Sequence, residues 1–244
     1  MAHAITGLPG YRSDRNATYR RIRKTDMGAI YMPGGVTIDG ANSGDAGNTG
    51  NTDVLRPGKI MVQAASGGLY RPLIIGLTTA AYADNDLTIT VSAATATEVA
   101  RLRTVAGGNI TLSLIGAATD AAAGAIVATD FSCTGASGTT LVCADLNVTK
   151  VTGALIALAT TTLAYVPGTA CFVDDGTGIK CSDEDGTRIN QPFPNALVGG
   201  YIDESQIIDF PSSANVTLRT YVRGLLNAAN TGYGFRFDGA EVGS

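Results

Sequence analysis

The sequence predicts a mainly β protein with one short helix, and three observations carry this prediction. Of the 244 residues, 31 are glycine and only 16% are charged, which is typical of chains with many short strands and turns. Apolar and polar residues alternate with a period of two in segments such as 86–92 and 109–115. Hydrophobic residues make up 45% of the chain without any tryptophan, so we expect a sizeable core of Val, Ile, Leu and Ala.

The first strands are expected directly after residue 53. Residues 54–63 and 69–75 are rich in aliphatic side chains, and the turn signals Pro57-Gly58 and 66–68 interrupt them. Further strands are expected in segments that share short apolar runs and flanking turn residues: 125–131, 139–151, 155–165, 196–202, 205–210 and 215–222. Residues 222–229 could instead turn helical.

One helix is expected over residues 95–106. Thr95 and Glu98 have the spacing of a capping box, which satisfies free backbone N–H groups at a helix start. Val99 and Leu102 fall on one face, and the glycines at 107 and 108 end the helix.

The charge is distributed unevenly along the chain. Residues 1–26 carry six basic and two acidic side chains, a net charge of +4, so the remaining residues must carry −8 to give the −4 of the whole chain. The six basic residues are Arg12, Arg15, Arg20, Arg21, Arg23 and Lys24. A basic arm that binds a negatively charged surface, either protein or nucleic acid, and a solvated terminus are both consistent with this pattern.

Residues 42–53 contain no large apolar side chain, and we expect them to form a flexible connector. An extended arm and this connector would together span residues 1–53. No segment near the start resembles a secretory signal, and the uncharged run 151–173 is broken by a Pro-Gly turn, so we expect a soluble protein.

The four cysteines form two pairs with equal spacing. Cys133 and Cys143, and Cys171 and Cys181, are each separated by nine residues with a glycine at the centre. If each segment is a hairpin, the cysteines could lie opposite one another and form disulfides. Reduced, partly buried thiols are the favoured interpretation because no signal for secretion is visible, and a zinc site would require closer pairs.

Acidic residues surround the second cysteine segment: Asp174, Asp175, Asp183, Glu184 and Asp185. A solvated hairpin tip explains them better than calcium binding, because the spacing of an EF-hand is missing. No other metal or cofactor is expected. The only histidine is His3, and the common nucleophile, phosphate-loop and zinc-protease motifs do not occur, so we do not expect an enzyme.

Several short segments resemble the head decoration, or cement, proteins of tailed bacteriophages. The leading strands of that family are similar to VLRPGKIM at 54–61 and GGLYRPL at 67–73, and its closing strands to segments 166–170, 196–204 and 214–224. The similarity covers about a third of the chain. It implies a small β-barrel or sandwich-like module from residues 54–75 and 163–244, into which a β-rich subdomain, residues 76–162 with the helix, is inserted.

The resemblance also implies a function. Members of this family bind the outer surface of a mature capsid in the virion, often as trimers, and clamp neighbouring capsomers without chemistry. The partner would be the major capsid protein, with the arm and its arginines lying across adjacent subunits after synthesis in a bacterial cytoplasm. Nucleic acid, membranes and small-molecule substrates are not expected partners. The alternatives are another virion component, such as a head-fibre base, tail protein or adhesin, and a small hydrolase.

Overall fold

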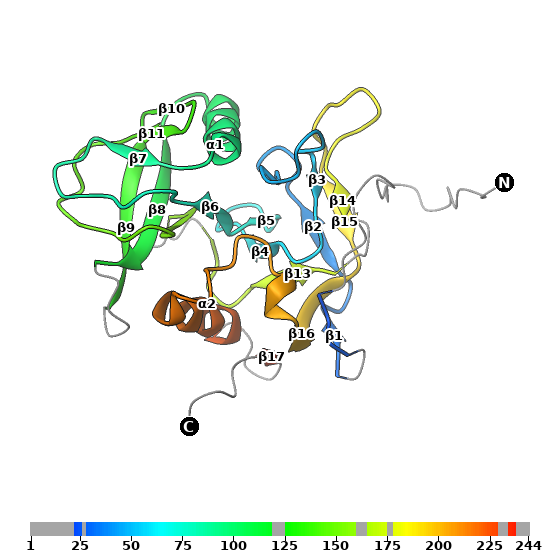
Figure 1. Cartoon of the computed structure of the whole chain (residues 1–244). Coiled ribbons are helices and arrows are strands. Elements are labelled where there is room, and N and C mark those ends of the chain that lie inside the picture. Colours follow the sequence, from blue (N-terminus) through cyan, green and yellow to red (C-terminus); the bar gives the residue numbers. More distant parts are fainter. Residues whose placement is uncertain are drawn as a thin grey trace.

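The computed structural model describes residues 22–25, 28–118, 125–159, 165–174, 178–228 and 234–237. Within these ranges the chain is mainly β, with seventeen strands, two α-helices and one short 3-10 helix, which confirms the predicted fold class. Figure 1 shows the large sheet on one side of the molecule and a smaller β-rich part with helix α1 on the other.

The largest sheet combines strands from both ends of the described chain. Its order is β1 (Ile30–Tyr31), β16 (Ala196–Ile202), β13 (Cys171–Val173), β4 (Ile60–Gln63), β5 (Tyr70–Pro72), β2 (Val36–Ile38) and β15 (Gln191–Phe193), and β17 (Phe235–Phe237) runs parallel to β16. Strands β3 (Val54–Leu55) and β14 (Ile179–Lys180) pair beside it. Strand β4 therefore joins β16 through β13, so residues from the segments 54–63 and 196–202 lie in one sheet.

Two smaller sheets form the other side of the molecule. One has the order β6 (Ile74–Leu77), β12 (Leu155–Leu158), β8 (Ile110–Ala117) and β9 (Ile126–Cys133), and the other has the order β10 (Gly135–Ser137), β11 (Thr140–Val142) and β7 (Thr88–Thr90). Helix α1 (Ala93–Ala106) contacts β6, β8, β10 and β11.

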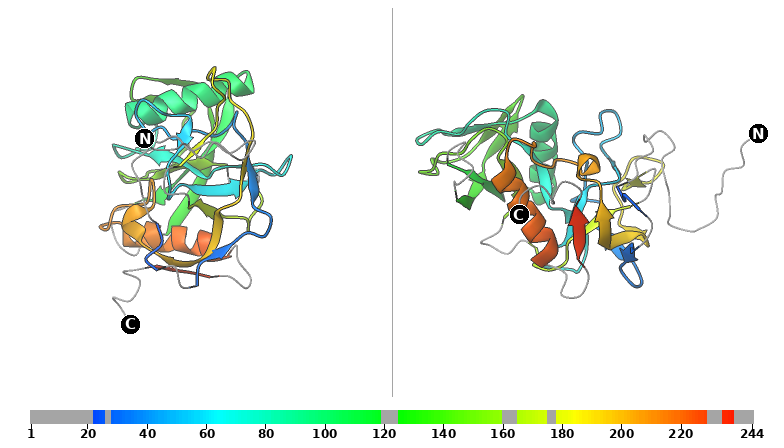
Figure 2. Two further views of the ribbon diagram at one scale, coloured as in Figure 1. Left: turned by 90° about the vertical axis from the view of Figure 1, so that its right-hand side faces the viewer. Right: turned by 60° about the horizontal axis from the view of Figure 1, so that its bottom comes forward.

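The main hydrophobic core is shared between the two sides. Phe172 and Leu197 of the large sheet and Leu155 and Ile115 of the four-stranded sheet belong to one buried cluster. Helix α2 (Val216–Ala228) contributes Leu218, Val222 and Leu226 to this cluster, each fully buried, and it also contacts β8 and β9. The two further views in Figure 2 show α2 alongside the sheets. Burial of apolar surface by α2 thus connects the two sides.

Helix α1 begins slightly earlier than the capping-box pattern predicts. Ser92 is the N-cap, and its hydroxyl oxygen accepts a hydrogen bond from the Thr95 backbone N–H at 3.1 Å. Thr95 is therefore the third helical residue, and Glu98 instead forms an ion pair with Arg101. The predicted end is correct, because Gly107 adopts the left-handed conformation (φ 70°) that a helix C-cap favours.

The strand predicted over residues 215–222 is wrong, since this segment forms the start of α2. Its apolar residues fit a period of two, but Leu218, Val222 and Leu226 also repeat every four residues and line one helix face. The side chain of Asn215 caps the helix by accepting a hydrogen bond from the Leu218 N–H at 3.2 Å. Residues 205–210 also do not form a strand, because the 3-10 helix Glu204–Gln206 begins there, with Asp203 as its N-cap.

The connector predicted over residues 42–53 is corrected by the structure as well. Strands β1 and β2 belong to the large sheet, so the folded body starts well before residue 54. In the glycine-rich stretch, Ser43 and Asp45 are fully buried. Asp45 is held by ion pairs, which supply the tertiary contacts that a stretch without apolar side chains otherwise lacks.

Candidate functional site

The basic N-terminal segment is attached to the body at Ile22–Lys24. Ile22 is fully buried in the main core, and its carbonyl oxygen accepts a hydrogen bond from the Asp203 N–H at 2.9 Å. The Lys24 N–H donates to the Tyr201 carbonyl at 2.8 Å, and Arg23 forms a β-bridge with Ile202. Residues 22–24 are therefore fixed to the end of β16.

The side chain of Arg23 completes this attachment. Its Nε lies 2.5 Å from Asp174 Oδ2, and the guanidinium group stands over the ring of Tyr31, 5.8 Å from the ring centroid. The Tyr31 hydroxyl also donates to Asp174 Oδ2, at 2.7 Å. Because Asp174 is only 4% exposed, this is a partly buried, charge-assisted contact. We call Ile22, Arg23, Lys24, Tyr31 and Asp174 the arm root.

Of the six basic residues predicted to bind a capsid, the structure describes two. Arg23 contacts Asp174 inside the molecule, and Lys24 is exposed. Arg12, Arg15, Arg20 and Arg21 lie outside the described residues.

The predicted acidic hairpin tip is only partly solvated. Asp174 is buried in the arm root, whereas Glu184 and Asp185 are exposed. Asp183 Oδ1 accepts hydrogen bonds from the backbone N–H groups of Asp185 (3.0 Å) and Thr187 (2.8 Å), so this carboxylate orders its own turn. Asp175 lies outside the described residues. In the part of the chain that the structure describes, no group of three His, Cys, Asp or Glu side chains is placed to hold a metal ion.

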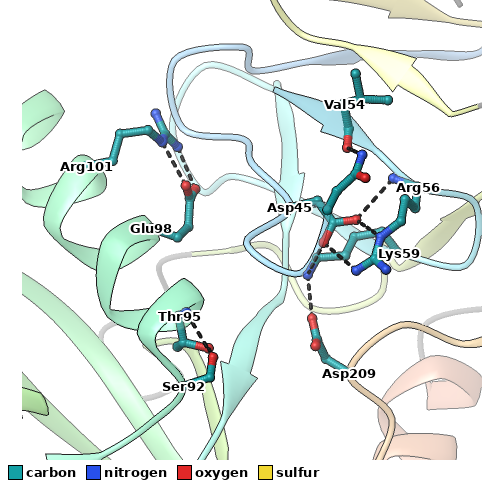
Figure 3. Close-up of polar contacts among 10 residues, drawn as sticks. Asp45, Val54, Arg56, Lys59, Ser92, Thr95, Glu98, Arg101 and Asp209 are labelled. Atoms are coloured by element: carbon teal, nitrogen blue, oxygen red, sulfur yellow. Dashed lines mark hydrogen bonds and ion pairs between the residues drawn. The ribbon is translucent and has the colours of Figure 1, made fainter. Parts of the chain in front are cut away.

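A buried charge cluster joins three separate segments of the large-sheet side (Figure 3). Asp45 is fully buried and accepts two hydrogen bonds from the Arg56 guanidinium, at 2.6 and 2.8 Å. The Lys59 ammonium group lies 2.5 Å from Asp209 Oδ2 and 3.9 Å from Asp45 Oδ1. These four residues, named the charge cluster below, tie the glycine-rich stretch, the turn before β4 and the segment after the 3-10 helix together.

The members of the charge cluster keep one another ionised. Burial opposes the charge of Asp45, but the hydrogen bonds from Arg56 and the Lys59 charge outweigh it and lower the pKa of the carboxyl group. Burial also opposes the charge of Lys59. The attraction of the Asp209 and Asp45 carboxylates is larger than this effect of burial, so the pKa of the amine is raised. Fixed ion pairs of this kind suit a structural clamp better than proton transfer near neutral pH.

Two further groups of ion pairs have the same character. Glu204, 5% exposed, accepts hydrogen bonds from Arg219 and Arg223 of α2. Glu98 forms a bidentate pair with Arg101 (Figure 3). The Arg101 Nη1 also donates to the Ala41 carbonyl at 2.5 Å. Both groups attach a helix to the neighbouring chain segments.

All four cysteines are buried free thiols. Cys133 and Cys143 flank the β10–β11 hairpin, which turns at Gly138 as the spacing predicted. The second segment does not form the expected hairpin, because Cys171 lies in β13 of the large sheet and Cys181 follows β14, which pairs with β3. Burial raises the pKa of Cys171 and of Cys181 to about 12, so both remain protonated at physiological pH.

One cavity lies between α1 and the glycine-rich stretch. It has a volume of about 290 Å³, and its lining includes Asn42, Arg71, Glu98, Leu102 and Leu112. Two of the polar groups there are engaged with protein partners: Glu98 binds Arg101, and the Asn42 amide donates to Asp39 at 2.8 Å.

No protein-family model, no curated protein and no solved structure matches the chain. Among the described residues, no helix is long and apolar enough to span a membrane.

Sequence reasoning missed the charge cluster and the arm root. The charges of Arg56 and Lys59 stand on either side of the Pro57-Gly58 turn, three residues apart, and that spacing was the available signal. Asp45 precedes Arg56 by 11 positions in a stretch without apolar side chains, and Asp209 is 150 positions from Lys59, so only the fold brings the four charges together.

Proposed function

We propose that the chain is a non-enzymatic structural protein of a tailed-phage virion that binds the outside of the mature capsid. In this proposal the segment before Ile22 lies across adjacent subunits of the major capsid protein and clamps them together. A homotrimer is the favoured assembly. The motifs shared with head decoration proteins support the proposal, and the geometry of the arm root is the observation that carries it.

The arm root matters because a segment can clamp a capsid subunit only if it is firmly attached to the folded body of the protein. The four arginines at positions 12, 15, 20 and 21 precede a segment that is fixed to the body by a buried isoleucine, two backbone hydrogen bonds and the Arg23–Asp174 pair. A partner held by those arginines would therefore be tied to the folded body. Arginine suits this task because its planar guanidinium group binds carboxylates in a bidentate manner.

The arm root also defines how the proposal must be tested. A deletion that extends into residues 22–38 would remove Ile22, β1 and β2 and damage the fold. Deletion of residues 1–21 leaves the arm root complete. We expect the truncated protein to retain its melting temperature within a few degrees and to lose co-sedimentation with mature capsids.

A charge variant separates the effect of the arginine charges from the effect of removing the whole segment. Replacing Arg12, Arg15, Arg20 and Arg21 by glutamine is expected to weaken capsid binding at least tenfold and to remove most of its salt dependence. Arg236→Gln, at an exposed position on β17, is the matched control and should bind like the wild type. Undiminished capsid binding by the protein lacking residues 1–21 would refute the clamp.

The alternative, that the chain belongs to another virion component, is tested in the same experiment. Purified tails are sedimented in parallel with mature capsids. Binding to tails and not to capsids would replace the decoration role with the alternative one.

A further inference from the structure

Strand β9 forms the longest open sheet edge in the described part of the chain. It pairs with β8 over all eight of its residues, in unbroken register from Ile110↔Cys133 to Ala117↔Ile126. It is the last strand in the order β6-β12-β8-β9, and no described strand pairs with its other side. In Figure 1 it lies next to β8.

The other sheet edges are short or protected. Strand β1 has two residues, β7 and β10 have three each, β6 has four, and the three-residue β15 contains Pro192, which has no N–H to donate. Natural proteins commonly protect exposed edges by short length, proline or lysine, because an open edge offers backbone groups to another strand. Strand β9 has none of these features.

The composition of β9 favours pairing. Its sequence, IVATDFSC, consists mostly of apolar and β-branched residues, and its only charge is Asp130. Val127 is 49% exposed although it is a large apolar residue in the middle of a sheet. The Lys150 ammonium group donates hydrogen bonds to the Val127 carbonyl at 2.8 Å and to the opposite Gly116 carbonyl of β8 at 3.1 Å, so this contact lies on the β8 side of the strand and not at its open edge.

We propose that β9 pairs antiparallel with β9 of a second copy of this chain, about a two-fold axis at Thr129. In a two-fold arrangement one residue faces itself, and its neighbours face each other in reverse order. With Thr129 at the centre, Val127 faces Phe131 and Ala128 faces Asp130, so residues 126–132 pair and the two carboxylates stay apart. The contact would span roughly 24 Å at about 3.4 Å per residue.

Charge selects this register among the two-fold alternatives. Centring the axis on Asp130 would give the same overlap but would place two carboxylates directly opposite each other, which is destabilising. Centring it on Ala128 would leave only residues 126–130 paired. The strand is therefore self-complementary in one register, which favours a second copy as the occupant of the edge.

This contact is separate from the proposed capsid binding, which uses the segment before Ile22. If the protein forms trimers through another surface, pairing through β9 would connect them two by two. Failure of the β9 experiments would leave the capsid experiment unaffected, and the reverse also holds.

Cysteine cross-linking of the full chain tests the register. Facing residues have Cβ atoms about 4.5–5.5 Å apart, close enough for a disulfide after small adjustments. Thr129→Cys should therefore give an interchain disulfide rapidly under mild oxidation. Val127→Cys is the matched control, because the two copies of residue 127 would be separated by four residues along the strands, roughly 14 Å. Equal cross-linking rates for both variants, or no dimer with Thr129→Cys, would overturn the proposal.

Sedimentation measures the same contact without oxidation. Thr129→Lys would place two ammonium groups face to face and should halve the mass of the assembly, from two copies to one or from six to three. Thr88→Lys, on the short β7 edge, is the control and should sediment like the wild type. A mass that Thr129→Lys leaves unchanged would contradict pairing through β9, provided that circular dichroism shows the variant to be folded.

Discussion

The charge cluster provides the sharpest test of how this fold is held together, through the substitution Asp45→Asn. Asp45 is fully buried, and its charge is neutralised by two hydrogen bonds from Arg56 and by the nearby Lys59 ammonium group. Asparagine has the same shape as aspartate but carries no charge. Removing one partner of a buried ion pair typically costs about 3–5 kcal/mol because the other charge remains buried. Lys59 keeps Asp209 and Arg56 is 24% exposed, so we expect about 2–4 kcal/mol.

The matched control is Asp209→Asn, which removes the same charge from the same cluster. Asp209 is 26% exposed, so water can partly replace the stabilisation that the ion pair gives to the Lys59 charge. We therefore expect the free energy of unfolding to fall by about 1–2 kcal/mol. Urea unfolding of both variants at neutral pH measures the difference. If Asp45→Asn costs less than 0.5 kcal/mol, or less than Asp209→Asn, the charge cluster does not clamp the glycine-rich stretch.

The pH dependence of the cluster follows from the signs of its two pKa shifts. The pKa of Asp45 is lower in the folded than in the unfolded chain, so its stabilisation is present above the unfolded value near 4 and is lost as the pH falls through the folded value. The pKa of Lys59 is raised, so its stabilisation is present below about 10 and is lost as the pH rises further. Asp45→Asn should therefore flatten the acid side of the stability profile more than the alkaline side.

Two further predictions concern the core and the thiols. Leu226→Ala, at a fully buried position of α2, should lower the free energy of unfolding by about 2–5 kcal/mol. The control Val216→Ala, at a position that is 57% exposed, should change it by less than about 0.5 kcal/mol. Urea unfolding measures both values, and equal effects would contradict the role of α2 in connecting the two sides of the molecule. All four cysteines should resist alkylation in the native protein and react completely after unfolding without reductant, as counted by mass spectrometry. Because the pKa of Cys171 is raised to about 12, its native labelling should remain slow at pH 9, and a missing alkyl group after unfolding would indicate a disulfide.

The sequence alone determined the mainly β character and the position of helix α1. Both depend on local signals: period-two alternation for strands such as β8, and a polar cap, an apolar face and a terminal glycine for the helix. The hairpin at Gly138 was predictable for the same reason, since two short strands next to a tight turn pair with each other.

Tertiary structure decided what local signals leave open. The apolar side chains of residues 216–228 fit both the period of a strand and the period of a helix. The segment forms a helix because Leu218, Val222 and Leu226 can then all be buried in the hydrophobic core that the two sheets share. The glycine-rich stretch has no apolar side chains with which to predict burial, yet Asp45 becomes buried because Arg56 and Lys59 neutralise it. The arm root could not be predicted from local patterns, because Arg23 and Asp174 lie 151 positions apart. Their charges come into contact only because β13 and β16 pair in the large sheet. Local patterns thus specified the elements, whereas pairing between distant charges and the shape of the shared core determined how they fit together.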